Sequence, residues 1–244
     1  MKDATTDRPL FVIPDVRACR IAGRVNRFVV KIELGGEMVR AHINNSGRLH
    51  EFLIAGREGF CFETRHTAKT DYRLFAVAEN NGGAVIDTQI QMKAFETAVR
   101  KNLIPWLRGY TFLRRNTRLG NSLIDYLFQH EESSVYLEVK SAVLREGAYA
   151  MYPDCPTLRG QRHVEELIRW ARKGGEAFVL FMAALPSAEG FKPYREADPR
   201  ISDLLDKAGK KGVRVKAMGI YFRPVDSRVY LYDPDLPVFI PSRG

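Results

Sequence analysis

Asp125, Glu138 and Lys140 are the residues whose types and spacing could do chemistry. Asp125 interrupts the apolar run Leu123–Phe128, and a buried carboxylate without a partner costs several kcal/mol. It therefore needs a cation, a metal ion or hydrogen-bond donors nearby. Glu138 and Lys140 stand two residues apart in the next apolar run. A strand there places both on one face, with Val139 on the other.

The polar segment 130–134 is predicted as a turn that joins the two runs into a hairpin, and this turn lets Asp125 approach Glu138. A hard cation such as Mg²⁺ prefers oxygen ligands in an octahedral array. Asp125, Glu138 and the carbonyl of Val139 would supply three of them. The cation would polarise a phosphoryl oxygen and lower the pKa of a bound water, while Lys140 would orient that water or stabilise charge on the phosphate.

The same residues also have a simpler interpretation, which is a cross-strand ion pair between Lys140 and one of the acids. A short pattern of an acid followed by Glu-x-Lys is common by chance. The spacing alone therefore leaves both interpretations open.

Residues 10–90 are predicted to form a small barrel. The segment Arg27–Leu34 ends at Gly35–Gly36, which is a hairpin signal, and Glu37–Ile43 follows as its partner strand. Three more short strands are expected at 59–63, 72–77 and 84–87. About five short strands with turns and almost no helix are typical of such a barrel.

The pattern changes near residue 90. Met92, Phe95, Val99 and Leu103 have helical spacing, and Pro105 is expected to stop that helix. Further helices are predicted around 164–171 and 201–208, and further strands at 177–182 and 213–221. We therefore expect two domains: a barrel over residues 1–90, and a mixed sheet flanked by helices, an α/β domain, over residues 91–244.

Composition narrows the function further. The chain has 244 residues, no apolar run long enough to span a membrane, and no apolar segment near its first residue that would mark a secretory signal. Cys19, Cys61 and Cys155 are far apart in the sequence, so neither a disulfide framework nor a cysteine zinc site is expected. We therefore expect a cytoplasmic location. The net charge of +9, concentrated after residue 90, favours a polyanionic partner.

A series of short motifs runs in order along the chain. Those of the first half are Arg24-x-x-Arg27-Phe28, Ala41-His42, Asn44-Asn45-Ser46-Gly47-Arg48-Leu49, Lys69-Thr70-x-Tyr72, Ile104-Pro105 and Gly109-Tyr110. Those of the second half are Arg114-Arg115, Gly120-Asn121-Ser122, Ile124-Asp125-Tyr126-Leu127, Tyr136-Leu137-Glu138-Val139-Lys140, Tyr152-Pro153-Asp154 and Arg159-Gly160-Gln161-Arg162-His163. Through them the chain resembles the sugar fermentation stimulation protein A family over nearly its whole length. It departs from the family at Ala68, where an arginine is usual.

This resemblance implies an N-terminal OB-like barrel and a C-terminal domain similar to PD-(D/E)xK nucleases. It implies that Asp125 is the first acid of that motif, Glu138 the second acid and Lys140 the lysine. Glu96 resembles the extra acid that many such nucleases place beside the metal, and Gln161 resembles a supporting amide. Mg²⁺ or Mn²⁺ is the expected cofactor.

The family is associated with DNA binding and with the regulation of sugar utilisation. Eight arginines are expected to contact nucleic acid: Arg24, Arg27, Arg48, Arg114, Arg115, Arg118, Arg159 and Arg162. For Arg48, which follows a turn of the barrel, a structural salt bridge stays open as an alternative. His163 and Pro153–Asp154 are expected near the site without an assigned role.

Three functions stay open at this point. The first is a DNA-binding protein with a Mg²⁺-dependent nuclease site of low sequence specificity. The second is a non-catalytic DNA-binding regulator of sugar-utilisation genes. The third, an enzyme acting on a small phosphorylated ligand, lacks a nucleotide-binding fingerprint. No membrane partner is expected, and the oligomeric state, with a homodimer among the options, stays open.

Overall fold

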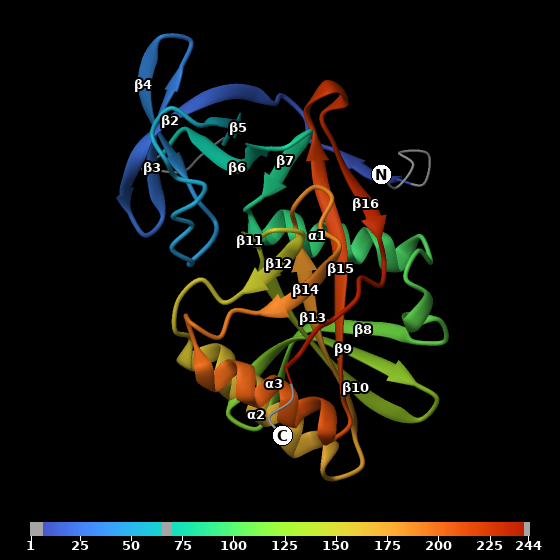
Figure 1. Ribbon diagram of the computed structural model, residues 1–244. Helices are drawn as coiled ribbons and strands as arrows, with labels where there is room; N and C mark the ends of the chain where they lie inside the picture. The colour runs from blue at the N-terminus through green and yellow to red at the C-terminus, as the bar shows by residue number, and fades with distance from the viewer. Residues whose placement is uncertain (1–6, 65–69, 242–244) are drawn as a thin grey trace.

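The computed structural model describes residues 7–64 and 70–241 (Figure 1). The motif residues Ala68 and Lys69 lie outside the described residues. Figure 1 shows a β-rich lobe at one end, formed by the N-terminal part of the chain, and a larger lobe of sheet and helices below it. No helix in the described ranges is long and apolar enough to cross a membrane.

The N-terminal lobe is a closed five-stranded barrel, which confirms the predicted architecture, but one of its strands differs from the prediction. The unpredicted segment 17–26 is a barrel strand, whereas the predicted strand at 84–87 overlaps β7 (Gly82–Val85), which joins the barrel to the sheet of the second lobe. The strands of the barrel are β2 (Arg17–Asn26), β3 (Val29–Leu34), β4 (Glu37–His42), β5 (Glu58–Glu63) and β6 (Tyr72–Glu79). They are hydrogen-bonded in the order β4-β3-β2-β5-β6, and β4 pairs again with β6, which closes the ring. Gly35 and Gly36 turn the β3–β4 hairpin with positive φ, a conformation that glycine adopts without strain.

The second lobe is built on a mixed sheet. Its strands are β7 (Gly82–Val85), β8 (Thr111–Leu119), β9 (Ser122–His130), β10 (Ser133–Ala142), β13 (Glu176–Ala183), β15 (Val213–Arg223) and β16 (Arg228–Asp233). β10, β13 and β15 run parallel in the centre, and β9 and β8 extend the sheet antiparallel to one edge. The segment at 177–182, a continuous apolar run in the sequence, is the buried centre of β13, as expected for a strand covered on both faces.

Helices cover both faces of this sheet, so the expected α/β architecture is confirmed. They are α1 (Thr88–Arg100), α2 (Leu158–Ala171) and α3 (Pro199–Lys210). Gln91 of α1 donates to Ser141 of β10, whereas His163 of α2 contacts Glu138 of the same strand. Because these two β10 residues are three positions apart, they lie on opposite faces, and so do α1 and α2.

Several elements differ from the prediction. Residues 111–119, noted only as a basic cluster, form the edge strand β8, whose exposed side chains hide the period-2 pattern. α1 begins at Thr88 because the Asp87 side chain accepts from the amide of Ile90 at 3.0 Å, and it ends at Arg100 rather than Ile104. The boundary expected at residue 90 therefore falls inside this helix.

The smaller elements complete the chain. They are β1 (Arg8–Val12), β11 (Leu144–Glu146), β12 (Tyr149–Tyr152), β14 (Gly190–Pro193) and two short 3₁₀ turns, η2 (Pro105–Leu107) and η3 (Pro224–Asp226). β1 pairs with β16, so the first strand belongs to the sheet of the second lobe rather than to the barrel. β11, β12 and β14 form a separate small sheet.

Candidate active site and nucleic-acid interface

A cleft of about 600 Å³ separates the barrel from the second lobe. The barrel lines it with Arg27, Phe28 and the loop 44–47. The second lobe lines it with residues from α1, β9, β10, β12 and the start of α2, among them Asp125, Glu138 and Lys140. The three residues singled out by type and spacing therefore share one cleft.

The β9–β10 hairpin opens at Asp125. Its ladder runs from Ser133 opposite His130 to Leu137 opposite Tyr126 and ends there. Beyond that point the Asp125 side chain replaces the backbone as hydrogen-bond acceptor, since its Oδ2 accepts from the amide of Val139 at 2.8 Å. The amide of Asp125 in turn donates to Oε2 of Glu138 at 3.2 Å. The two carboxylates are thus adjacent, as the predicted turn required.

Glu138 is the centre of a buried polar cluster. Its Oε1 accepts from Nζ of Lys140 at 2.6 Å and is also hydrogen-bonded to Nδ1 of His163. Nε2 of His163 lies 3.4 Å from Nε of Arg159, which is always a donor. Because the ionised Glu138 carboxylate can only accept, Nδ1 of His163 donates to it. Lys140 and His163 are then two donors converging on one carboxylate oxygen.

The electrostatics of the two acids differ. Burial alone would raise the pKa of Glu138, but Lys140 and His163 outweigh it and hold that pKa below its ordinary value. Burial would likewise lower the pKa of Lys140, and Glu138 reverses this. For Asp125, burial and the charge of Glu138 outweigh the charge of Lys140 and the hydrogen bond from the Val139 amide, and they raise its pKa to about 7. Asp125 is therefore the acid of the pair whose charged form a bound cation would stabilise.

The donor set fits a hard divalent cation. In the described part of the chain, no three His, Cys, Asp or Glu side chains form a cluster that could hold a metal ion. Two carboxylates and a backbone oxygen are present instead. The N–H and C=O of a strand residue point to the same side, so the Val139 carbonyl faces Asp125 as its amide does. All three donors carry oxygen, which suits Mg²⁺, Mn²⁺ or Ca²⁺.

Glu96 does not join this set, which corrects the expected third ligand. Its carboxylate accepts from the hydroxyl of Tyr126 at 2.8 Å and is paired with Arg115. Tyr126 follows Asp125 in β9, and neighbouring strand residues project to opposite faces. Glu96 therefore lies on the α1 face of the sheet and does not line the cleft.

Gln161 is also engaged elsewhere. Its Nε2 donates to both carboxylate oxygens of Asp198, at 3.0 and 2.9 Å. Asp198 caps α3 by accepting from the amide of Ile201, and it accepts from Thr157 ahead of α2. Gln161 thus joins the starts of two helices and supports the site only through α2.

The eight arginines have different surroundings. Arg27 and Arg159 line the cleft, and Arg48 lines a smaller neighbouring cavity of about 420 Å³. Arg114, Arg118 and Arg162 are exposed on β8 and α2. Arg115 is paired with Glu96, and Arg24 donates to the carbonyls of Asn26, Arg27, Gly47 and Arg48. Arg24 therefore holds the barrel loops rather than facing a ligand.

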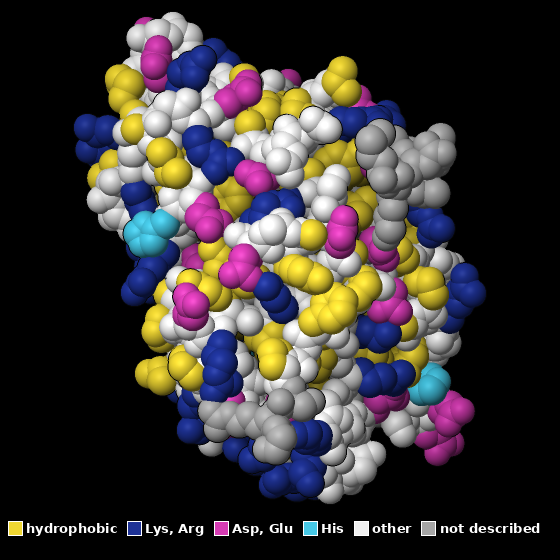
Figure 2. All heavy atoms as spheres, in the orientation of Figure 1, with side chains coloured by type: hydrophobic (Ala, Val, Ile, Leu, Met, Phe, Trp, Pro, Cys, Tyr) yellow, Lys and Arg dark blue, Asp and Glu magenta, His cyan; other side chains and the backbone are white. Residues whose placement is uncertain are grey.

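Other basic side chains gather away from the cleft. Figure 2 shows Lys and Arg clustered at the lower end of the molecule, over α2 and α3. Several of them are already paired with acids, for example Arg200 with Glu165 and Lys210 with Asp206. This surface adds positive charge to the molecule away from the cleft.

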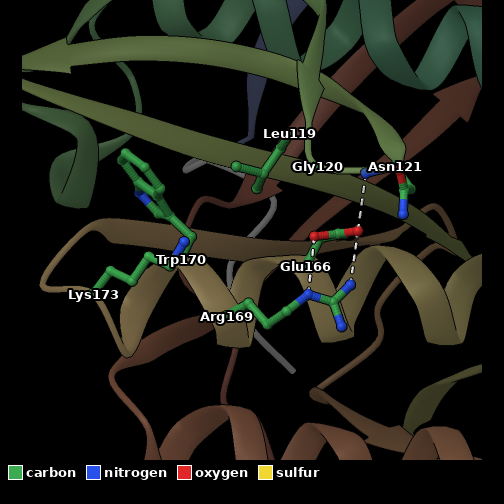
Figure 3. A pocket seen from close by; sticks show the side chains of 7 residues that line it. All are labelled: Leu119, Gly120, Asn121, Glu166, Arg169, Trp170 and Lys173. Carbon is green, nitrogen blue, oxygen red and sulfur yellow. Dashed lines mark hydrogen bonds and ion pairs between the residues drawn. The ribbon is translucent and has the colours of Figure 1, made fainter.

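The strand that holds Asp125, β9, is anchored to α2 at its N-terminal end, through the β8–β9 turn. Figure 3 shows Glu166 between Arg169 and the β8–β9 turn, beside a hollow of about 420 Å³. The Glu166 carboxylate accepts from the amide of Asn121 at 3.1 Å and from Nε of Arg169 at 3.1 Å. A side chain on Gly120 would reach within 2.4 Å of Glu166, so glycine permits this close approach.

Sequence reasoning missed three features of the cleft. Gln91, in the first turns of α1, is buried and lines it, although a polar residue among the apolar positions of a helix is a readable signal. Asp154 was expected near the site and does line the cleft, but its hydrogen bond was not foreseen: it accepts from the amide of Leu49 at 2.9 Å and so ties the barrel to the second lobe. Phe28 appeared only as a motif member and lies on the cleft wall.

Two family models match the chain. The one described as the SfsA N-terminal OB domain covers residues 23–86, and the one described as the Sugar fermentation stimulation protein RE domain covers residues 89–225. The barrel is thus an OB domain and the second lobe a restriction-endonuclease-like domain, which confirms the expected fold class.

Relatives match over almost the whole chain. A sugar fermentation stimulation protein homolog from Archaeoglobus fulgidus is 46% identical over 231 residues, which is 95% of this chain and 99% of the relative. The homolog from Pyrococcus furiosus is 44% identical over 212 residues, which is 87% of this chain and 92% of the relative. A solved structure of Pyrococcus furiosus SfsA in complex with Ca²⁺ superposes with a TM-score of 0.91 at 42% identity, covering 96% of this chain and all of that one.

Proposed function

This chain belongs to the sugar fermentation stimulation protein family, and we propose that it is a DNA-binding protein that hydrolyses phosphodiester bonds with Mg²⁺ or Mn²⁺. The observation that carries the proposal is the opened hairpin, where Asp125, Glu138 and the Val139 carbonyl converge beside Lys140 in one cleft. The related Pyrococcus furiosus protein was solved with Ca²⁺, a cation that prefers the same oxygen donors.

The residues of the cleft would have different roles in this reaction. Asp125, Glu138 and the Val139 carbonyl would hold the cation, which when bound polarises a phosphoryl oxygen and acidifies a water. Lys140 has one N–H directed to Glu138, and its remaining N–H groups can donate to a water or to a phosphate oxygen. His163 fixes the orientation of Glu138 from behind.

Backbone phosphates of DNA would be held by the arginines that face the cleft. Arg27 approaches from the barrel and Arg159 from the start of α2, so positive charge lies on both walls. Contacts with phosphates fix the position and orientation of the protein along the DNA and carry no sequence information. We therefore expect low sequence specificity and binding that weakens steeply with salt.

A specific observation favours a second candidate, a DNA-binding regulator without catalysis. Lys140 and His163 are hydrogen-bonded to the Glu138 carboxylate, which therefore needs no metal ion as a partner, as expected if the acids and the lysine serve only as a structural cluster. In that case the protein binds DNA but does not cut it.

The test is cleavage of supercoiled plasmid and of single-stranded DNA with Mg²⁺ or Mn²⁺. The native protein is expected to cut, and Asp125→Asn to cut at least about 100-fold more slowly, since losing a direct metal ligand costs more than the 10- to 100-fold typical of an outer-shell partner. Asparagine keeps an acceptor for the Val139 amide, so the hairpin stays intact. DNA binding without metal is expected to persist.

Cys155→Ser is the matched control, because Cys155 lines the same cleft and is not among the donors. It is expected to cut like the native protein. If the native protein binds both DNAs but cuts neither with either metal, the nuclease proposal fails and the regulator takes its place.

A further inference from the structure

The barrel presents an aromatic ring to the cleft opposite the acidic residues. Arg27 and Phe28 form the turn between β2 and β3, and both line the cleft that Asp125 and Glu138 also line. Phe28 is 45% exposed. Single exposed apolar residues are ordinary on protein surfaces, so the surroundings of the ring decide what it means.

The turn that carries Phe28 is firmly held. The amide of Phe28 donates to the side chain of Asn26 at 2.9 Å, and its carbonyl accepts from Ile43 at 2.9 Å. Nη2 of Arg24 donates to the carbonyl of Arg27 at 2.6 Å. The ring is therefore presented from a fixed backbone, which limits the entropy lost when a ligand packs on it.

The ring also has aromatic and cationic neighbours. His42 of β4 is stacked with it, with ring centroids 6.3 Å apart and planes 24° apart. The guanidinium of Arg27 lies 5.5 Å from the ring centroid, within reach of a cation–π interaction. An aromatic surface with an adjoining positive charge is what a nucleotide needs, since its base stacks and its phosphate is anionic.

We propose that Arg27, Phe28 and His42 form a base-stacking platform that selects unpaired nucleic-acid strands for the cleft. One base of the strand packs on Phe28, Arg27 binds an adjoining phosphate, and the strand continues across the cleft to Asp125 and Glu138. This inference rests on the proposed function for the fate of that strand, but the platform itself concerns binding alone.

The physical reason for the selectivity is access. Inside a duplex both faces of a base are covered by its neighbours, so Phe28 has nothing to stack on until the strand is unpaired. In a single strand each base offers a free face, and stacking on an aromatic side chain is worth about 1–3 kcal/mol per base. The platform is therefore expected to favour single strands whatever their sequence.

The experiment measures binding without divalent metal, by fluorescence anisotropy. The probes are a labelled single-stranded oligonucleotide, its duplex, and an abasic strand of the same length that keeps every phosphate. The native protein is expected to bind the single strand about 10-fold more tightly than the abasic strand, the equivalent of one stacked base. Phe28→Ala is expected to remove that difference and to leave duplex binding unchanged.

Two control variants test the assignment to the aromatic ring. Phe28→Trp keeps an aromatic face and is expected to retain the preference for the single strand. Met38→Ala removes another exposed apolar side chain of the barrel, 58% exposed and outside the cleft lining, and is expected to bind like the native protein. The folded state of each variant is checked by its thermal unfolding.

The inference is overturned if Phe28→Ala binds all three probes as the native protein does, or weakens all three equally. Cleavage assays keep this outcome separate from the proposed function. If the native protein cuts no DNA but Phe28→Ala removes its preference for the single strand, the platform is supported and the nuclease proposal fails. If the native protein cuts DNA with a metal ion but Phe28→Ala binds all probes normally, the nuclease proposal is supported and the platform fails.

Discussion

Glu138 is the residue on which the geometry of the cleft depends. It is almost fully buried, at 2% exposure, yet its charge is supported by Lys140 from its own strand and by His163 from α2. A buried carboxylate that kept only one of these donors would lose both orientation and electrostatic support. His163 is thus a positioning residue, since it would act on a ligand only through Glu138.

His163→Ala is therefore expected to weaken divalent-cation binding about 10-fold, the lower end for loss of an outer-shell partner. Titration calorimetry with Mg²⁺ and with Ca²⁺ measures the change. His163→Gln, which can still donate to Glu138, is expected to recover part of the affinity.

His130→Ala serves as the control, because His130 contacts Glu176 rather than any residue of the cleft. Metal affinity that is unchanged in a folded His163→Ala protein would contradict the positioning role.

At the scale of elements, α2 organises the site from two of its turns. His163 reaches Glu138 of β10, and Glu166, one turn further on, holds the amide of Asn121 in the β8–β9 turn. The helix thus fixes both strands that supply the acids. Arg169 donates to the Glu166 carboxylate and is the main cause that lowers its pKa below the ordinary value of 4.5.

A lowered pKa makes the contribution of Glu166 depend on pH with a definite sign. Its folded-state pKa lies below its unfolded-state pKa, so its stabilising effect is complete above pH 4.5 and is lost as the pH falls through the folded-state value. Glu166→Gln is expected to lower the free energy of unfolding by about 1 kcal/mol at neutral pH, and by less at pH 4. Urea unfolding at the two pH values measures both differences.

Glu165→Gln is the matched control on the same helix. Glu165 pairs with Arg200 at the surface, where 66% of the arginine side chain is exposed, and such pairs contribute little. A change as large as that of Glu166→Gln, or an effect of Glu166→Gln that grows at pH 4, would contradict this account of the anchor.

At the scale of the whole molecule, strand pairing and side-chain packing join the two domains. One hydrogen-bonded sheet passes from β6 of the barrel through β7 into β15. Phe222 of β15 packs against Phe60 and Phe75 of the barrel, with ring centroids 5.2 and 4.9 Å apart. The cleft walls are therefore parts of one packed body, which suits a site assembled from both domains.

This continuity predicts one cooperative unfolding transition for the protein. Phe222→Ala is expected to destabilise it by about 3 kcal/mol, which for a chain of this size lowers Tm by about 10 °C, while a single transition persists. Scanning calorimetry measures both. Phe239→Ala, at a half-exposed position, is expected to shift Tm far less, and two resolved transitions in the native protein would show that the domains unfold independently.

The sequence by itself determined the local features of this protein. Strand periodicity put Glu138 and Lys140 on one face, and the turn brought Asp125 beside them, because alternation and hairpin closure depend on neighbouring residues only. Short strands followed by alternating helices and strands predicted the barrel and the α/β domain. The exposed edge strand β8 was not predicted, because its apolar and basic side chains do not alternate.

Only the tertiary structure decided which distant residues complete the cleft. Glu96 was expected among the acids, but the docking of α1 puts it against Tyr126 on the other face. The docking of α2 brings His163 to Glu138, and the packing of the barrel brings Phe28 to the cleft. These contacts join residues far apart in the chain, so they depend on how whole elements pack and on no local pattern of residue types.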